Sequence, residues 1–461
     1  MRRNAVLGAG AAAVALAFAF GEARAQGYGV YEHDACVMAR SGTGVAAPCS
    51  GGSAIYFNPA GIVGSSTRWN AQVGATIISP RGGFTSDASG ATTDATANNI
   101  PVPTLFATRQ LNARWAIGIG VFAPYGLISE WPDTFEGRFL AYLADLKAIY
   151  IQPTVAVKLR DNLRIGGGFQ MTFSSVELRQ RVDLSAQVAS TTPVVLRFSD
   201  LGVPVGTDFA DAHVQGSSRS AGGQLGIIWD ATPRVSLGAR YQFRQTADIG
   251  GDATFTQIAT GIVLPPGNPI APANTPLDSV VAPQFRGAGL LTAQKGFARV
   301  PLPDQFVVGV AVRPRTNLTV LFDFQWVNWD RFEILTLGFA RLGQRTQFED
   351  YNETHGYRLG VDWQATSRLS LRGGTLYHTA AAPPQTVTPL LPEGERHEGT
   401  FGLGYQLSPK LRIDLAYQRI EQQDRRGRVV DAPRGTAGVA ANSGLYTSTA
   451  NLFGASLAFG F

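Results

Sequence analysis

Few side chains in this sequence are spaced for catalysis or for metal binding. No HExxH, CxxC or G-x-S-x-G motif occurs. The string GIGVFA, from Gly118 to Ala123, fits a dinucleotide-binding fingerprint, but Pro124 follows where the fingerprint requires a helix to start. The histidines lack the spacing of metal ligands: His33, His213, His355, His378 and His397. We therefore expect neither an enzyme nor a metal or cofactor site.

The charges best suited to bind an anion lie in LRIGGGFQMTFSSVELRQR. The apolar parity of this segment shifts after Phe173, and a β-bulge at Ser174-Ser175 would explain the shift. If the segment is a barrel strand, the bulge turns Arg179 and Arg181 inward, where a guanidinium can bind a carboxylate. We expect Arg179 and Arg181 as candidate head-group contacts, with plain lining of the lumen as the alternative.

Residues 1–25 have the composition of a secretory signal peptide. Arg2 and Arg3 form a basic start, an apolar run follows, and an Ala-Arg-Ala sequence ending at Ala25 supplies the small residues before a cut. The apolar run is shorter than the ~20 residues of a membrane-spanning helix. We expect cleavage before Gln26 and export of the chain, with an uncleaved anchor as the alternative.

After this segment, apolar and polar residues alternate with the period of a β-strand. In LRIDLAYQ, one face carries only apolar residues: Leu411, Ile413, Leu415 and Tyr417. YRLGVDWQ, LTVLFDFQW and RVSLGARYQF repeat the pattern. Charged residues make up only 16% of the chain, against about 25% in soluble domains. An exported chain of this kind can span a membrane as a β-barrel.

The connections between the strands are of two kinds. Six short polar turns occur at 109–114, 160–162, 230–234, 313–317, 364–368 and 408–410. They alternate with seven long stretches near 81–100, 123–146, 184–212, 248–300, 332–352, 379–396 and 422–448. These connections join fourteen strands, and short turns opposite long loops are typical of bacterial outer-membrane barrels. We expect an all-β fold, a 14-stranded antiparallel transmembrane barrel over residues 69–461.

Residues 26–68 lack clear alternation and precede the first strand. They contain the apolar patch AIYFNPAGIV, which a disordered tail has no reason to carry. We expect this segment to fold as a plug in the lumen, with a disordered periplasmic tail as the alternative. Cys36 and Cys49 lie in the segment, and an oxidising compartment favours a disulfide between them.

The triplet Asn58-Pro59-Ala60 in AIYFNPAGI resembles the plug motif of the FadL family. These are outer-membrane transporters for long-chain fatty acids and related hydrophobic compounds, including aromatic hydrocarbons. FAPYGLISEWPDTFEGRF, PLPDQFVVGVAVRPRTNLTVLFDFQWVNW, and YRLGVDWQATSRLSLRGGTLY followed by PEGERHEGTFGLGY are similar to the same family. The resemblance spans the mature chain and implies a fourteen-stranded barrel, an N-terminal hatch inside it, and passive uptake without an energy source.

The resemblance also suggests a role for Ala123, Pro124, Tyr125 and Gly126, which follow the strand segment Trp115–Phe122. Proline and glycine weaken a strand at this point, and the position matches the kinked third strand of the family, where an opening leads sideways into the membrane. An apolar solute that leaves through the wall avoids exposing its chain to water, at about 0.8 kcal/mol per CH₂. The alternative is that Pro124 and Gly126 only begin an outer loop.

We therefore expect a bacterial outer-membrane transporter that captures hydrophobic molecules with its outer loops, binds them in the lumen and releases them at the third strand. Long-chain fatty acids are the first candidate. The alternatives are an aromatic hydrocarbon transporter of the same family, a general diffusion porin, and an outer-membrane enzyme or adhesin. Apolar loops near 184–212 and 248–300 are candidates for capture, and contact with lipopolysaccharide is the other explanation for them. We expect a monomer with no nucleic-acid partner.

Overall fold

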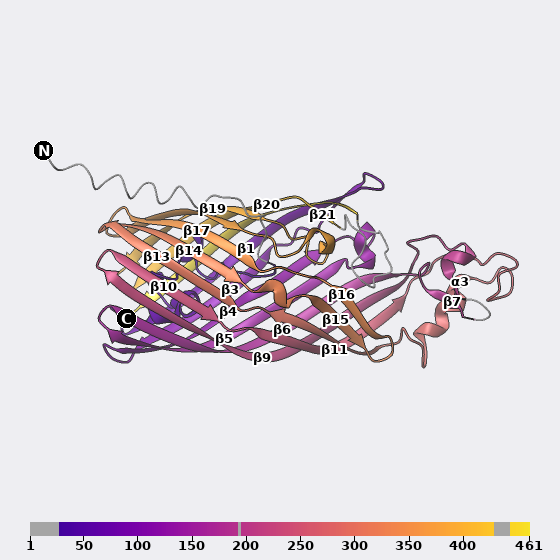
Figure 1. Ribbon diagram of the computed structural model, residues 1–461, viewed down its shortest axis with the longest axis horizontal. Helices are drawn as coiled ribbons and strands as arrows, with labels where there is room; N and C mark the ends of the chain where they lie inside the picture. Colours follow the sequence, from indigo (N-terminus) through magenta and orange to yellow (C-terminus); the bar gives the residue numbers. More distant parts are fainter. Residues whose placement is uncertain (1–26, 192–194, 428–442) are drawn as a thin grey trace.

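The wall strands close into one barrel in the computed structural model, which describes residues 27–191, 195–427 and 443–461 (Figure 1). The predicted signal segment lies outside these residues. The prediction of fourteen antiparallel strands is confirmed. The last strand pairs with the first from Asn70↔Gly460 to Ser86↔Gly444, so the sheet closes on itself. Two of the wall strands are each divided into two pieces, one into β10 and β11 and the other into β12 and β13.

In chain order, the wall strands are β1 (Trp69–Ser86), β3 (Ile100–Gln110), β4 (Trp115–Glu130), β5 (Leu143–Arg160), β6 (Leu163–Asp183), β9 (Asp208–Thr232), β10 (Val235–Gln242) with β11 (Gln245–Gln257), β12 (Gln294–Leu302) with β13 (Gln305–Arg315), β14 (Leu318–Val327), β17 (Thr354–Gln364), β18 (Leu369–His378), β19 (Arg396–Ser408), β20 (Leu411–Gln422) and β22 (Gly444–Gly460).

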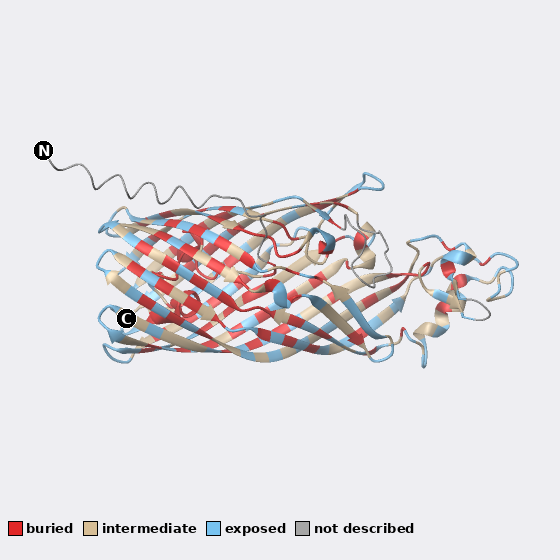
Figure 2. Ribbon diagram, viewed as in Figure 1, coloured by how far each residue is buried: buried red, intermediate tan, exposed pale blue. Residues whose placement is uncertain are grey.

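Buried and exposed residues alternate along the wall strands (Figure 2). On β13, for example, Phe306 and Val308 face outward, whereas Gln305 and Val307 are buried inside. Apolar outer faces and a polar interior are the pattern of a barrel that stands in lipid. Four tryptophans near the short turns, each 42–46% exposed, mark one edge of this apolar belt: Trp69, Trp115, Trp229 and Trp363.

All six predicted short turns are confirmed, whereas several long connections are shorter than predicted. β4 continues to Glu130 and β5 starts at Leu143, where the sequence indicated a single loop over 123–146. The stretch 332–352 contains the hairpin of β15 (Ile334–Phe339) and β16 (Gly343–Phe348). Beyond the lipid, a strand needs no apolar outer face, so the alternation that reveals strands fades there.

The remaining elements are short. The strands are β2 (Thr92–Asp94), β7 (Val188–Ser190), β8 (Leu196–Arg197) and β21 (Arg425–Gly427). The helices are α1 (Ala35–Met38), α2 (Ala54–Phe57), η1 (Pro59–Ile62), η2 (Glu136–Phe139), η3 (Phe198–Leu201), α3 (Leu277–Val281), η4 (Ala282–Phe285), η5 (Trp329–Arg331) and η6 (Pro384–Thr386). In the part of the chain that the structure describes, no helix has the length and apolarity to cross a membrane.

The N-terminal segment, residues 27–68, packs against the inner side of the wall. Most of its residues are buried. Gly52 N donates to Gln72 Oε1 of β1 at 3.0 Å, and Gly44 N donates to Asp323 Oδ2 of β14 at 2.8 Å. Because β1 and β14 are far apart in the strand order, these contacts hold the segment from different sides of the wall.

Candidate functional site

The wall has a gap between its second and third strands, β3 and β4. Their pairing ends at Leu105↔Val121. Beyond that point β3 still pairs with β1 as far as Ile100, and β4 still pairs with β5 as far as Glu130. Beyond Leu105 and Val121, β3 and β4 therefore remain neighbours in the strand order but are not paired with each other.

Prolines occur on both edges of this gap, Pro101 and Pro103 on β3 and Pro124 on β4. Proline has no N–H to donate to a ladder and is confined to sheet edges and bulges. If the register of the paired part continued, Pro103 would lie opposite Ala123 and Pro124 opposite Val102. The gap thus has a cause on each edge. Sequence reasoning missed the β3 edge, although the Pro-Val-Pro pattern there was a visible signal.

The expectation that the third strand ends at Phe122 is wrong. β4 continues to Glu130, with an irregularity against β5 between Phe122 and Tyr125. Pro124 and Gly126 are therefore strand residues and do not begin an outer loop. The pairing of β4 with β3 ends near Phe122, although the strand itself continues. Proline removes a hydrogen-bond donor from one edge of the strand, but its backbone stays extended.

The N-terminal segment pairs with β4 at this point. Val30 N donates to Pro124 O at 2.9 Å, and Gly126 N donates to Tyr28 O at 3.0 Å. Backbone groups left unpaired at the depth of a membrane are costly. The N-terminal residues satisfy two of them and form the inner side of the gap.

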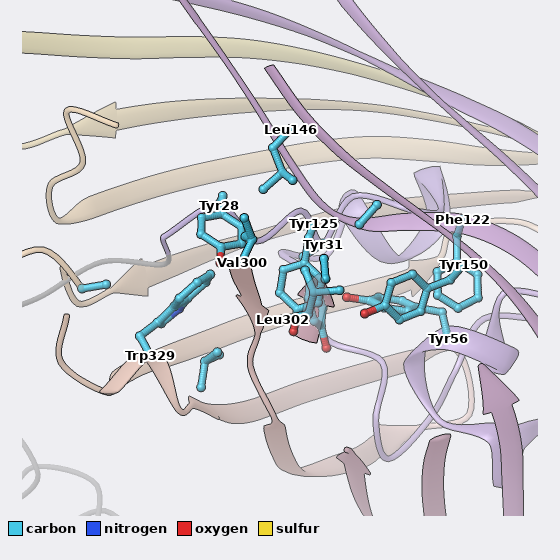
Figure 3. Close-up of a cluster of buried hydrophobic side chains, with 14 of the residues drawn as sticks. Tyr28, Tyr31, Tyr56, Phe122, Tyr125, Leu146, Tyr150, Val300, Leu302 and Trp329 are labelled. Atoms are coloured by element: carbon cyan, nitrogen blue, oxygen red, sulfur yellow. The ribbon is translucent and has the colours of Figure 1, made fainter. Parts of the chain in front are cut away.

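Tyr125 points into the interior of the barrel (Figure 3). Its hydroxyl donates to Pro303 O at 2.6 Å and accepts from Gln305 Nε2 at 2.8 Å. Its ring meets those of Tyr28 and Trp329 edge-on, with centroids 6.1 and 6.3 Å apart. This buried aromatic cluster fixes β4 and the start of the N-terminal segment relative to each other.

A cavity of about 420 Å³ lies against the gap. Of the four residues that we expected at an opening, Ala123, Tyr125 and Gly126 line this cavity, and Pro124 does not. β19, β20 and β22 form another side, with apolar side chains such as Leu452. Small-molecule pockets span about 300–1,000 Å³. An apolar cavity of this size beside a gap in the wall is suited to hold a hydrophobic solute.

Asn58-Pro59-Ala60 docks on the inner face of β6 and β9. The Asn58 Nδ2 donates to Val45 O at 2.7 Å and to Ile227 O at 3.0 Å, and its Oδ1 accepts from Ala60 N at 3.1 Å. The amide thus joins two parts of the N-terminal segment to the wall.

Two paired glycines, Gly166 of β6 and Gly226 of β9, face this triplet with backbone alone. A Cβ on Gly166 would lie 2.6 Å from Ala60 N, and one on Gly226 would lie 2.8 Å from the Pro59 ring. Both distances are shorter than side chains tolerate, so the close approach of segment and wall requires glycine at these positions.

Cys36 and Cys49 form a disulfide within the N-terminal segment, with their Cα atoms 6.3 Å apart. Both residues belong to the apolar core that the segment shares with the wall. Closing a loop of about 15 residues stabilises a fold by about 3 kcal/mol in the chain-entropy account.

Replacing both cysteines by serine should leave the barrel assembled and make the N-terminal segment easier to cleave. A loss of about 3 kcal/mol raises the population of the displaced segment about a hundredfold. Limited proteolysis followed by mass spectrometry measures this, with heat-modifiable gel mobility as the control for the barrel. Two free thiols in the unreduced natural chain, or equal cleavage of both proteins, would contradict the prediction.

Arg179 and Arg181 do not face the lumen. β6 pairs with both β5 and β9 without a register shift at Ser174-Ser175. In this part of the strand, which the structure describes, the expected bulge is therefore absent. The outward parity of β6 therefore continues to the arginines. The strand has left the apolar belt at this height, so outward charges do not meet lipid tails.

These outward charges are paired with one another. Arg179 contacts Glu177 at 3.1 Å, and Arg181 contacts Asp211 at 2.8 Å. Tyr142 donates to the same aspartate at 2.8 Å. Burial and that carboxylate raise the pKa of Tyr142 to about 12, so the phenol stays a donor. The two arginines are thus unsuited to bind a head group in the lumen.

The two apolar outer loops pack against each other. Residues 184–207 and 258–293 contribute to one apolar core, which includes Phe198, Leu264 and Leu277. The resulting module, with β7 and α3, extends beyond the barrel (Figure 1). Among its described residues, the large apolar side chains that stay exposed are those of Val188, Val195, Val205, Val263 and Leu290. The apolar composition of the loops therefore serves mainly to build this module.

The histidines in the barrel have structural contacts. His33 packs edge-on against Tyr56, with ring centroids 4.4 Å apart. His378 Nε2 lies 3.0 Å from a guanidinium nitrogen of Arg358. Among the described residues, no group of three or more His, Cys, Asp or Glu side chains is arranged to hold a metal ion.

Comparison with known proteins places the chain in a family. Residues 16–461 match the model of the outer membrane protein transport proteins (OMPP1/FadL/TodX). Outer membrane protein P1 of Haemophilus influenzae is 24% identical over 407 residues, which are 84% of this chain and 81% of that protein. The long-chain fatty acid transport protein of Escherichia coli O6:H1 is 22% identical over 402 residues, with 84% and 85% covered.

Solved structures share the fold. A Pseudomonas aeruginosa FadL homologue has a TM-score of 0.80 at 21% identity and covers 95% of this chain and 100% of its own. The Pseudomonas putida toluene transporter TodX has a TM-score of 0.67 at 16% identity, with 95% and 99% covered. Together with the family match over nearly the whole sequence, this means that the chain belongs to the FadL family (OMPP1/FadL/TodX) of outer-membrane transporters of hydrophobic compounds.

Proposed function

We propose that this chain takes up long-chain fatty acids passively and releases them sideways through the gap between β3 and β4. The observation that most directly supports this proposal is the apolar cavity of about 420 Å³ beside the gap. A path that remains apolar from the cavity into the membrane saves a fatty acid about 0.8 kcal/mol for each CH₂ that would otherwise enter water. Such transfer is downhill and needs no energy source.

The N-terminal segment acts as a plug in this proposal. Its burial and its contacts with β1 and β14 support that role. A general diffusion porin needs an open, water-filled lumen. A segment held inside the barrel by wall side chains argues against that alternative.

Capture begins at the outer loop module. Val205 is 78% exposed, and Val195 is 61% exposed on the same module. Exposed apolar groups of this kind usually mark a contact surface. A solute arriving from outside meets the module before it reaches the barrel. The alternative is that the exposed residues contact lipopolysaccharide, in which case the module has no role in transport.

Relatives of this chain differ in substrate. The Escherichia coli relative is named a long-chain fatty acid transport protein, and TodX is named a toluene transporter. Aromatic hydrocarbons are therefore the second candidate, for which the same cavity and gap would serve.

Uptake of labelled oleate and labelled toluene by cells with and without this protein tests the proposal. We expect the protein to raise the uptake of oleate, because its cavity is apolar and opens towards the wall. A rise for toluene alone would favour the aromatic alternative. A rise only for small polar solutes would contradict the proposal and favour a porin.

A further inference from the structure

We infer that Arg396 binds the anionic head group of the solute, so that the chain favours carboxylated amphiphiles over neutral hydrocarbons. The inference rests on the proposed function and names the substrate class of the same cavity. Arg396 was not among the residues that the sequence indicated.

Arg396 is placed at the lumen side of the cavity. It is the first residue of β19. Its side chain lies on the same face of the strand as those of Glu398 and Thr400, which are buried inside the barrel. Across the ladders it lies opposite His378 and Gln422, and it is one of the cavity-lining residues. The gap strands β3 and β4 form a different side of the same cavity.

The guanidinium of Arg396 makes no hydrogen bond or ion pair with the described residues. Its Nε is buried and has no partner there. An arginine side chain carries five N–H donors and no acceptor, and native structures pair nearly all buried polar groups. An unpaired guanidinium on the wall of an apolar cavity points to a partner that the ligand supplies.

The nearby carboxylates are engaged elsewhere. Gln418 Nε2 donates to Glu32 Oε1 at 3.1 Å and also to Glu398. Tyr31 N donates to the other oxygen of Glu32 at 2.9 Å. Both carboxylates therefore have donors of their own.

A third acid close in sequence, Glu393, is also occupied. It is buried and accepts from Gly27 N at 2.8 Å and from the backbone of Ala381 and Ala382 at 3.0 Å. It therefore holds the start of the N-terminal segment against the outer connection between β18 and β19, and it is not a partner for Arg396.

The other cations that line the cavity lie at its outer edge. Lys147 is paired with Asp145 at 2.5 Å, and Arg81 is exposed on the outer face of β1. Arg396 is thus the lumen-side cation that is free to bind an anion, among the residues described. A carboxylate can accept two parallel N–H bonds from a guanidinium, whereas a neutral hydrocarbon offers no acceptor.

Binding at Arg396 also orients the solute. The cavity between Arg396 and the gap is lined by apolar side chains such as Val30, Leu391 and Val102. With its carboxylate at Arg396, a fatty acid directs its tail towards the gap. The tail then enters the membrane first, and the carboxylate leaves the guanidinium last.

Binding of oleate and of methyl oleate to the purified full-length protein tests this inference. The two probes have the same chain and differ in charge. Arg396→Gln should weaken oleate binding roughly ten- to a hundredfold, since a charge-assisted hydrogen bond is lost. Methyl oleate should bind equally to both proteins. Arg396→Lys should recover part of the oleate affinity. Arg419→Gln is the matched control that should change neither probe, because Arg419 lies on the outer face of the neighbouring β20 and does not line the cavity.

Each outcome has a distinct meaning. Unchanged oleate binding in a folded Arg396→Gln protein, or an equal loss for both probes, would overturn the inference, the second result showing a structural role. If the natural protein binds neither probe, the proposed function itself fails. Heat-modifiable gel mobility establishes folding, and Arg396→Lys provides the same comparison of probes should the glutamine variant not assemble.

Discussion

A reducible cross-link across the wall gap should stop most of the uptake and leave binding intact. Cysteines at Pro103 and Ala123 would lie on the two edges, opposite each other in the continued register. Joined by a reducible bis-maleimide, they obstruct the route into the membrane. A fatty acid must then expose part of its chain to water, and two methylenes at about 0.8 kcal/mol each slow release about tenfold. Reduction of the linker under conditions that leave the buried Cys36–Cys49 disulfide intact should restore uptake.

The matched control is the same cross-link two residue pairs further along the ladder, at Leu105 and Val121. These residues are paired in the closed part of the same two strands, so joining them should leave uptake unchanged. Oleate binding to the purified, cross-linked proteins separates release from capture. Normal uptake through the obstructed gap would show that the solute leaves by another route, most directly past a displaced N-terminal segment into the periplasm.

The sequence was sufficient to predict the strands and turns of the barrel, because those signals are local. Each wall strand inside the apolar belt has its own alternation, and each short turn has its own polar residues, as in RPRTN. The ends of the outer strands could not be predicted in this way. Above the apolar belt, the outer face of a strand can carry polar residues without contacting lipid tails, so the alternation is lost. β11 is an example.

The direction of Arg179 shows the limit for single side chains. The position of Arg179 in the apolar–polar alternation could be read from the sequence. Whether a bulge turns it inward or it points outward depends on its height relative to the lipid. That height is set by the stagger of the whole sheet, which is not a property of one segment.

The site was predictable where it is local and not where it is assembled. Pro124 and Gly126 mark the gap within one strand. Pro103 gains its meaning only beside β4, a neighbour that the fold supplies. Arg396 is one of several charges in PEGERHEGT, and its unpaired state appears only when the carboxylates around it are seen to have other donors.

Gly166→Val should open the barrel to small polar solutes. A Cβ at this position would lie 2.6 Å from Ala60 N, so the triplet at Asn58 can no longer dock without displacement. Overpacking of this kind costs about 1–3 kcal/mol, which shifts the docking equilibrium by roughly five- to a hundredfold towards the displaced segment. If the segment is the plug, swelling of liposomes in a small sugar should become faster than with the natural protein.

Gly167→Val is the matched control, since the two glycines are neighbours on opposite faces of β6. A Cβ on Gly167 would lie 3.1 Å from the outward side chain of Leu225 and 3.5 Å from Gln224 O, and it meets no residue of the N-terminal segment. Valine favours a strand equally at both positions, so any difference in leakage reports on the inner face alone. Equal, slow swelling with both folded variants would mean that residues 27–68 are not the barrier to polar solutes. The seal would then have to come from the outer connections, and the docking of Asn58-Pro59-Ala60 would serve the stability of the barrel instead.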